Sequence, residues 1–98
     1  AYSASKGGVA QLTKALSNEW AAEGINVNAI APGYMATALT DTMKVKNPAQ
    51  YDETTRRIPM GRWGTAEDLK GLAVFLASDA SAYISGAVIP VDGGFLGR

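Results

Sequence analysis

The chain has 98 residues, of which 47% are hydrophobic and 18% are charged, with nine basic residues balancing nine acidic ones. This composition is ordinary for a folded protein of one domain or less, and the even charge gives no reason to expect nucleic acid or a membrane surface as a partner. The absence of cysteine and histidine excludes disulfides, Cys/His metal sites and Ser-His-Asp hydrolysis among these residues, so we expect no metal. No stretch has the pattern of a membrane helix or a secretion signal, so we expect a cytoplasmic protein.

The first predicted element is a helix over residues 3–23. Gly24 is the expected helix stop, because glycine readily adopts the left-handed conformation that ends helices. Apolar residues recur along the helix at spacings of three and four and form one stripe, which comprises Val9, Leu12, Leu16 and Trp20. The stripe can pack on a sheet or on a second subunit, and the spacing does not separate these alternatives.

A strand is predicted over residues 25–31, where branched apolar and polar residues alternate before the run turns apolar. It should end at Pro32 and Gly33, since proline has no backbone donor for a sheet and glycine permits a sharp turn. Residues 37–46 fit a short helix, and residues 48–57 fit another with Pro48 in its first turn. Residues 61–64, with the sequence Gly-Arg-Trp-Gly, are predicted to form a loop.

Thr65 and Asp68 have the spacing of a capping box, in which Asp68 reaches back to the start of a helix. That helix should run to about residue 78 and bury one face, which consists of Leu69, Leu72, Ala73 and Leu76. Residues 81–86 fit a turn region and residues 87–91 a short final strand. Asp92 is expected to be a turn residue before two glycines, rather than a catalytic acid.

Two parallel-type strands joined by helices do not close a hydrophobic core, because such a sheet needs more strands and cover on both faces. We therefore expect an α/β fold of which this chain is the second half, with the first strands of the sheet absent. The start at Ala1 rather than at a methionine agrees with a piece of a longer protein.

Tyr2 and Lys6 stand four residues apart at the start of the first helix, so both can point from one helical face. A phenol has a pKa of about 10, and a nearby ammonium favours its ionised form. Such a tyrosine can accept a proton from an alcohol or give one to a carbonyl. The same spacing also occurs by chance in exposed pairs on many helices.

Four further motifs follow this pair along the chain, and they favour a functional interpretation of its spacing. Besides the Tyr2–Lys6 motif these are residues 26–33 (NVNAIAPG), Thr37, residues 61–64 (GRWG) and residues 91–94 (VDGG). Together they resemble the C-terminal half of a short-chain dehydrogenase/reductase, over essentially the whole chain. The resemblance implies one Rossmann-like domain, of which residues 1–98 would be the C-terminal part of a doubly wound parallel sheet. It also implies an NAD or NADP cofactor, with NAD favoured.

The resemblance implies a role for six residues. Tyr2 matches the catalytic acid/base and is also a cofactor-binding position, and Lys6 matches the lysine that assists it and holds the nicotinamide ribose. The remaining four match cofactor-binding positions: Pro32 and Gly33 beneath the nicotinamide, Met35 whose backbone meets the carboxamide, and Thr37 whose hydroxyl lies near the carboxamide and pyrophosphate. Because the glycine-rich phosphate turn and the family's catalytic serine and asparagine have no counterpart among these residues, the 98 residues alone are expected to be inactive.

Within the family, residues 18–21, 30–37 and 57–64 resemble 2-deoxy-D-gluconate 3-dehydrogenases, also called 2-dehydro-3-deoxy-D-gluconate 5-dehydrogenases. This implies alcohol/ketone conversion on a sugar acid, with gluconate 5-dehydrogenases or other short-chain reductases as alternatives. Tyr34 could cover such a substrate, and Arg62 could bind its carboxylate. A local ion pair between Arg62 and the acidic residues of the following helix is the stronger expectation.

The resemblance also implies a homotetramer, because in the family the helix that begins with the Tyr2–Lys6 motif forms a subunit interface. A different reading is non-enzymatic: a truncated half-domain that only associates with other subunits.

Overall fold

The computed structural model describes residues 2–97, with side chains described for residues 4–96. The chain divides into two compact units: Ala1–Ala31 with Leu72–Ile89, and Pro32–Gly71 with Pro90–Arg98. Within the described residues, no helix combines the length and the hydropathy needed to cross a membrane.

The first unit begins with helix α1, Tyr2–Trp20, which continues as a 3₁₀ turn over Ala21–Glu23. Gly24 ends the helix with a φ of 82° and donates its backbone N–H to the carbonyl of Ala21. Both the predicted helix and its glycine stop are therefore confirmed. The left-handed conformation is the one that residues with a Cβ rarely adopt, which explains glycine at this position.

The strand predicted over residues 25–31 is shorter than expected, because strand β1 spans only Ala29–Pro32. The residues just before it keep one backbone bond, from the N–H of Gly86 to the carbonyl of Val27 at 2.7 Å, and otherwise bond through side chains. Asn28 donates to the carbonyl of Ile84 at 3.0 Å and accepts from the backbone of Ala87 at 3.0 Å. Asn26 donates to the carbonyl of Ala82 at 3.2 Å. These bonds satisfy the neighbouring backbone without a regular ladder.

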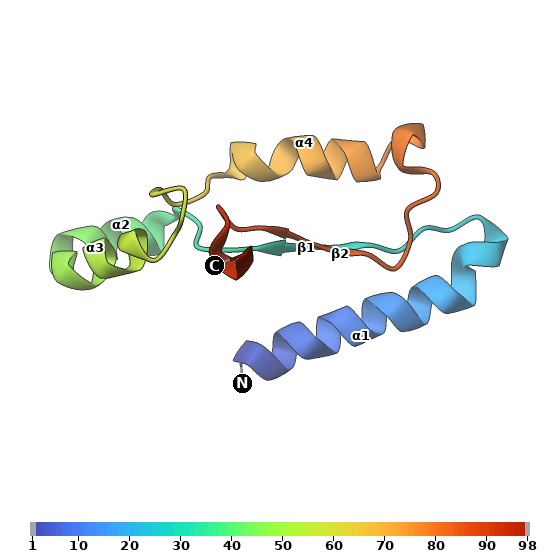
Figure 1. The fold of residues 1–98 in the computed structure, drawn as a ribbon, viewed down its shortest axis with the longest axis horizontal. Coiled ribbons are helices and arrows are strands. Elements are labelled where there is room, and N and C mark those ends of the chain that lie inside the picture. The colour runs from blue at the N-terminus through green and yellow to red at the C-terminus, as the bar shows by residue number, and fades with distance from the viewer. Residues whose placement is uncertain (1, 98) are drawn as a thin grey trace. The chain divides into compact units, whose positions relative to one another are not determined.

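Strand β2, Val88–Val91, pairs with β1 in parallel (Figure 1). The backbone N–H of Ala29 donates to Ala87 at 2.9 Å, and that of Gly33 donates to Val91 at 3.0 Å, so the register advances in the same direction along both strands. The predicted final strand is confirmed to within one residue. The carboxyl ends of the two strands consequently share one edge of the sheet.

In the second unit, helices α2 (Ala38–Lys46) and α3 (Pro48–Arg56) lie side by side as a hairpin (Figure 1). Both helices agree with the prediction. Asn47 joins them: its backbone N–H donates to Met43 at the end of α2, and its side chain accepts from the backbone of Gln50 at the start of α3. Pro48 occupies the first turn of α3, where a missing N–H costs nothing.

Helix α4 spans Ala66–Leu76 and ends two residues earlier than predicted. Its predicted buried face is wrong: the three leucines of that face are half-buried, Ala73 is exposed, and no residue of α4 is buried. A two-stranded sheet offers too narrow a face to bury a helix. Short 3₁₀ turns follow at Asp79–Ser81 and Phe95–Gly97.

Few side chains are buried among residues 4–96. Ile58 and Trp63 are the buried apolar residues, both in the second unit. In the first unit the buried face of α1 carries Thr13 and Ser17, and the Ser17 hydroxyl lies 2.6 Å from that of Ser85. The predicted apolar stripe of α1 is largely exposed, with Val9 and Leu12 at 55% and 57%.

Candidate functional site

Four of the predicted cofactor residues lie between the end of β1 and the start of α2: Pro32, which is the last residue of β1, and then Gly33, Met35 and Thr37. Gly33 lies against Asp92 at the end of β2: a Cβ placed on Gly33 would be 2.7 Å from the Cβ of Asp92 and 2.8 Å from its Cα. Atoms cannot approach so closely, so only glycine fits here. Asp92 accepts backbone N–H bonds from Gly94 and Leu96, at 3.0 and 3.2 Å, which confirms it as a turn residue.

Met35 is held from one side by Gly64, with which it forms an isolated parallel bridge. Gly64 donates its N–H to the carbonyl of Tyr34 at 2.8 Å and accepts from the N–H of Ala36 at 2.7 Å. In an extended chain, the backbone N–H and carbonyl groups of successive residues point to opposite sides. Since Tyr34 and Ala36 bond to Gly64, the N–H and carbonyl of Met35 point away from it. Among the described residues, no hydrogen bond involves the Met35 N–H or carbonyl.

Thr37 is the N-cap of α2. Its hydroxyl accepts from the backbone N–H of Thr40 at 3.4 Å, and the Thr40 hydroxyl accepts from the N–H of Thr37 at 2.7 Å. This reciprocal pair is a capping box built from two threonines. The Thr37 side chain therefore lies at the positive end of the helix dipole, where negative charge is stabilised.

A cavity of about 350 Å³ opens beside this turn, inside the second unit. Its walls include Tyr34, Met60, Arg62, Gly64 and Asp68, together with the 90–94 segment. Both predicted substrate residues, Tyr34 and Arg62, thus lie on the same cavity. This volume is at the lower end of the range for small-molecule sites, about 300–1,000 Å³.

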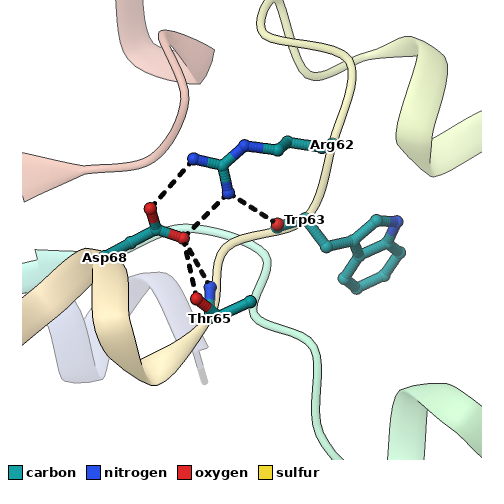
Figure 2. A network of polar contacts seen from close by, with 4 residues as sticks. All are labelled: Arg62, Trp63, Thr65 and Asp68. Carbon is teal, nitrogen blue, oxygen red and sulfur yellow. Dashed lines mark hydrogen bonds and ion pairs between the residues drawn. The ribbon is translucent and has the colours of Figure 1, made fainter.

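Arg62 forms a two-pronged ion pair with Asp68, through Nη1 at 2.8 Å and Nη2 at 2.9 Å (Figure 2). Nη1 also donates to the carbonyl of Trp63 at 3.2 Å. The Asp68 carboxylate accepts further bonds from the backbone N–H and the hydroxyl of Thr65, at 2.8 and 3.1 Å. The hydrogen bond from Arg62, and next the one from the Thr65 backbone, hold the pKa of Asp68 well below its usual range. The pKa of Arg62 is raised by the same pair.

This geometry agrees with the local ion pair expected from the sequence, and it confirms that Asp68 reaches back to Thr65. The Thr65 hydroxyl, however, donates to the carboxylate, so the box is completed in only one direction. The substrate-carboxylate role of Arg62 stays a prediction. For that role the guanidinium would have to bind a second anion through the N–H groups that do not bond to Asp68.

Tyr2 and Lys6 belong to α1 and to the first unit, whereas the other candidates belong to the second. Their backbones have the predicted separation of four helical residues. The side chain of Tyr2 lies outside the described residues, and Lys6 is exposed. The proposed catalytic pairing of the two side chains is therefore a prediction.

Two contacts of this region were not predicted: the bridge between Met35 and Gly64 and the bond between Trp63 and Thr55. The sequence places Trp63 only in the loop of residues 61–64, and in the structure its indole N–H donates to the Thr55 hydroxyl at 2.7 Å. The Gly-Arg-Trp-Gly motif was a signal for the loop. The partners of its backbone and of its indole lie at other places in the sequence and could not be read from it.

Comparison with known proteins places these motifs in a family. The family model described as enoyl-(acyl carrier protein) reductase matches residues 1–96. The 2-dehydro-3-deoxy-D-gluconate 5-dehydrogenase of Pseudoalteromonas atlantica is 55% identical over 97 residues, which are 99% of this chain and 38% of that protein. The chain thus spans well under half the length of the curated relatives it matches.

Solved structures agree. A crystal structure from Agrobacterium tumefaciens, assigned as a 2-deoxy-D-gluconate 3-dehydrogenase with bound NADP, has a TM-score of 0.91 and 56% identity over 99% of this chain and 39% of its own. One from Beutenbergia cavernae, assigned as an NAD(P)-dependent gluconate 5-dehydrogenase with NADP at low occupancy, has a TM-score of 0.90 and 52% identity over the same shares. Both contain NADP, so the preference for NAD receives no support. These matches show that the chain belongs to the short-chain dehydrogenase/reductase family and corresponds to a C-terminal part of its Rossmann-type fold.

Proposed function

We propose that the protein carrying this chain is an NAD(P)-dependent dehydrogenase that interconverts a secondary alcohol and a ketone on a sugar acid of the 2-deoxy-D-gluconate or 2-dehydro-3-deoxy-D-gluconate type. The observation that carries the proposal is the match of 99% of this chain to dehydrogenases of that type. A helix that begins with Tyr2 and holds Lys6 one turn later supports it.

In this proposal Tyr2 is the general acid/base. Its hydroxyl would take the proton of the substrate alcohol during oxidation and return a proton to the carbonyl oxygen during reduction. Lys6, four residues further along α1, would favour the ionised phenol by placing positive charge near it. A bound nicotinamide would accept the hydride from the carbon that bears the hydroxyl group during oxidation, and would donate a hydride to the carbonyl carbon during reduction.

The turn after β1 fits a nicotinamide cofactor. The Met35 N–H and carbonyl have no hydrogen-bond partner among the described residues, so they are available to a carboxamide, which needs one acceptor and one donor. The close approach of Gly33 to Asp92 keeps side chains out of the turn. We propose that Lys6, Pro32, Gly33, Met35 and Thr37 hold the cofactor. Two related structures with NADP make NADP the first cofactor to test.

We propose that the sugar acid enters the cavity lined by Tyr34 and Arg62. Tyr34 offers a hydroxyl and a ring face, and Arg62 contributes positive charge even though Asp68 partly neutralises it. Gluconate 5-dehydrogenase activity is the second candidate, because the Beutenbergia cavernae structure assigned to that activity matches over the same 99% of the chain.

The test is a substrate and cofactor panel on the full-length protein that carries these residues. Oxidation and reduction are followed at the nicotinamide absorbance, with 2-dehydro-3-deoxy-D-gluconate, 2-deoxy-D-gluconate, gluconate and neutral hexitols, each with NADP(H) and NAD(H). A sugar acid giving the highest kcat/KM supports the proposal. A clear preference for the neutral hexitols, or no turnover with any sugar acid, contradicts it.

We also propose that the full-length protein assembles as a homotetramer and uses the exposed stripe of α1. Val9 and Leu12 are 55% and 57% exposed, although both are large apolar residues. Native mass spectrometry of the wild type should show four subunits, and Leu12→Glu should reduce that number. A monomeric wild type contradicts this assembly, whereas a tetramer without dehydrogenase activity would favour the purely associative alternative.

A further inference from the structure

Trp63 connects helix α3 to the turn that carries the candidate cofactor and substrate residues. It is only 7% exposed, in a unit where few side chains are buried. Its indole points away from the ion pair formed by the neighbouring Arg62 (Figure 2). The loop of residues 61–64 therefore contacts two helices: Arg62 bonds to α4 and Trp63 bonds to α3.

The contact with α3 is specific in both geometry and hydrogen bonding. The ring of Tyr51 stacks on Trp63 with centroids 5.0 Å apart and planes at 6°. One turn later, the Thr55 hydroxyl accepts the indole N–H at 2.7 Å and donates its own hydrogen to the carbonyl of Tyr51 at 2.8 Å. Because Tyr51 and Thr55 occupy one face of α3, the two contacts together set the rotation of the helix about its axis.

Trp63 also contacts Tyr34, with ring centroids 5.4 Å apart in an edge-on arrangement. Tyr34 is in turn packed edge-on against Phe95 at 5.5 Å. Tyr34 lines the candidate substrate cavity, as do Arg62 and Gly64, the two sequence neighbours of Trp63. A movement of α3 that displaces the indole would therefore also displace Tyr34, which forms part of the wall of that cavity.

A second attachment keeps the chain in place when this contact is weakened. Ile58, just beyond α3, is 3% exposed, and its Cγ2 would lie 2.9 Å from a Cβ on Gly93. The N–H of Met60 donates to the carbonyl of Gly93 at 3.0 Å. Loss of the indole contact would therefore free the body of α3 while its end stays tied to the turn after β2.

We infer that Trp63 and Thr55 form a positioning pair that holds the α2–α3 hairpin in register with Tyr34, and that this pair sets the affinity of the site for the sugar acid. Neither residue touches the reacting atoms in this account, because both act through Tyr34 and α3. The inference rests on the proposed function for its substrate, although the positioning itself is a property of the fold.

The test uses Thr55→Val in the full-length protein, which keeps the shape of the side chain and removes the acceptor. We expect the KM for the sugar acid to rise about 5- to 10-fold, as for a lost hydrogen bond of about 1 to 1.4 kcal/mol, with kcat and the KM for NADP changed less than about 2-fold. Thr55→Ser should restore the wild-type KM. The matched control is Thr42→Val: its hydroxyl also bonds the carbonyl four residues back, at 3.2 Å to Ala38, and it is exposed on α2.

Hydrogen exchange gives a readout that does not depend on activity. In Thr55→Val, amides of residues 48–56 should exchange faster while those of α4 stay unchanged. Unchanged exchange in 48–56, an unchanged KM for the sugar acid, or an equal loss in kcat and in cofactor affinity would each overturn the inference. If the wild type turns over no sugar acid, the proposed function fails, and the exchange experiment alone then decides whether Trp63 and Thr55 position α3.

Discussion

Gly33 and Asp92 meet at the carboxyl ends of the two paired strands so closely that a methyl group on Gly33 would lie 2.7 Å from the Asp92 Cβ and 2.8 Å from its Cα. Real carbon atoms do not approach to this distance without bonding. Since one of the two opposing atoms is backbone, the strand ends would have to separate to admit any side chain. This contact therefore couples the turn that carries Met35 and Thr37 to the end of β2.

Gly33→Ala should lower the free energy of unfolding by about 1–3 kcal/mol or more, because overpacking against backbone leaves no rotamer to move. Gly64→Ala is the informative contrast. Its Cβ would lie 2.7 Å from the Met35 sulfur, which is the flexible end of a side chain, so the loss should be smaller. Urea unfolding of the two variants checks the order. Gly71→Ala, within α4 and with nothing within 4 Å, is the control and should be neutral or stabilising; a larger loss for Gly64→Ala than for Gly33→Ala would contradict this packing.

Thr37→Ala should cost about 0.5–2 kcal/mol of stability through loss of the α2 cap. It should also weaken NADP binding, because the proposed cofactor contact uses the same hydroxyl. Thr37→Ser retains both functions and is the matched control. Calorimetric titration of NADP alongside thermal unfolding separates the two effects. If stability falls while cofactor affinity is unchanged, Thr37 is only a helix cap.

Asp68→Asn should remove a pH-dependent part of the stability. The folded-state pKa of Asp68 is depressed, first by Arg62 and then by Thr65, so the unfolded chain takes up a proton on acidification before the folded chain does. The contribution is thus fully present above the ordinary carboxyl pKa and is lost as the pH falls below about 4.

Unfolding midpoints of the wild type and of Asp68→Asn, measured between about pH 7 and pH 3, should differ most near neutrality and converge in acid. Glu67→Gln removes the adjacent charge of the same helical turn and is the control. A difference between wild type and Asp68→Asn that grows on acidification would be the wrong sign for this ion pair.

Residue type and spacing predicted the helices correctly where the structure depends on residues close together in the sequence. The spacing of Val9, Leu12 and Leu16 predicted α1, Gly24 predicted its end, and the Thr65–Asp68 spacing predicted the contact at the start of α4. Each depends on residues within one or two helical turns. The strand before Pro32 was predicted too long, because Asn26 and Asn28 bond to a segment almost sixty residues away.

The site divides in the same way. The turn at Gly33 could be predicted from residue type, since proline fixes its φ and lacks a backbone donor while glycine adopts conformations closed to other residues. Thr37 falls inside the helix predicted over residues 37–46, whereas it is the N-cap of α2. The Met35–Gly64 bridge and the bond between Trp63 and Thr55 could not be predicted, because they depend on how separate segments pack. Burial along the stripe of α1 was also not predictable, since spacing defines an apolar face without defining what covers it.

The role of Tyr2 is tested most directly by the single-turnover rate of hydride transfer in Tyr2→Phe of the full-length protein, measured with NADP and the best sugar acid beside a titration of NADP binding. Tyr83→Phe, at a fully exposed tyrosine, is the control. If Tyr2 is the general acid/base, hydride transfer should fall by about 10²-fold or more while the dissociation constant for NADP stays within about 3-fold. Near-normal hydride transfer in Tyr2→Phe would contradict the assignment of this chain to a tyrosine-dependent dehydrogenase.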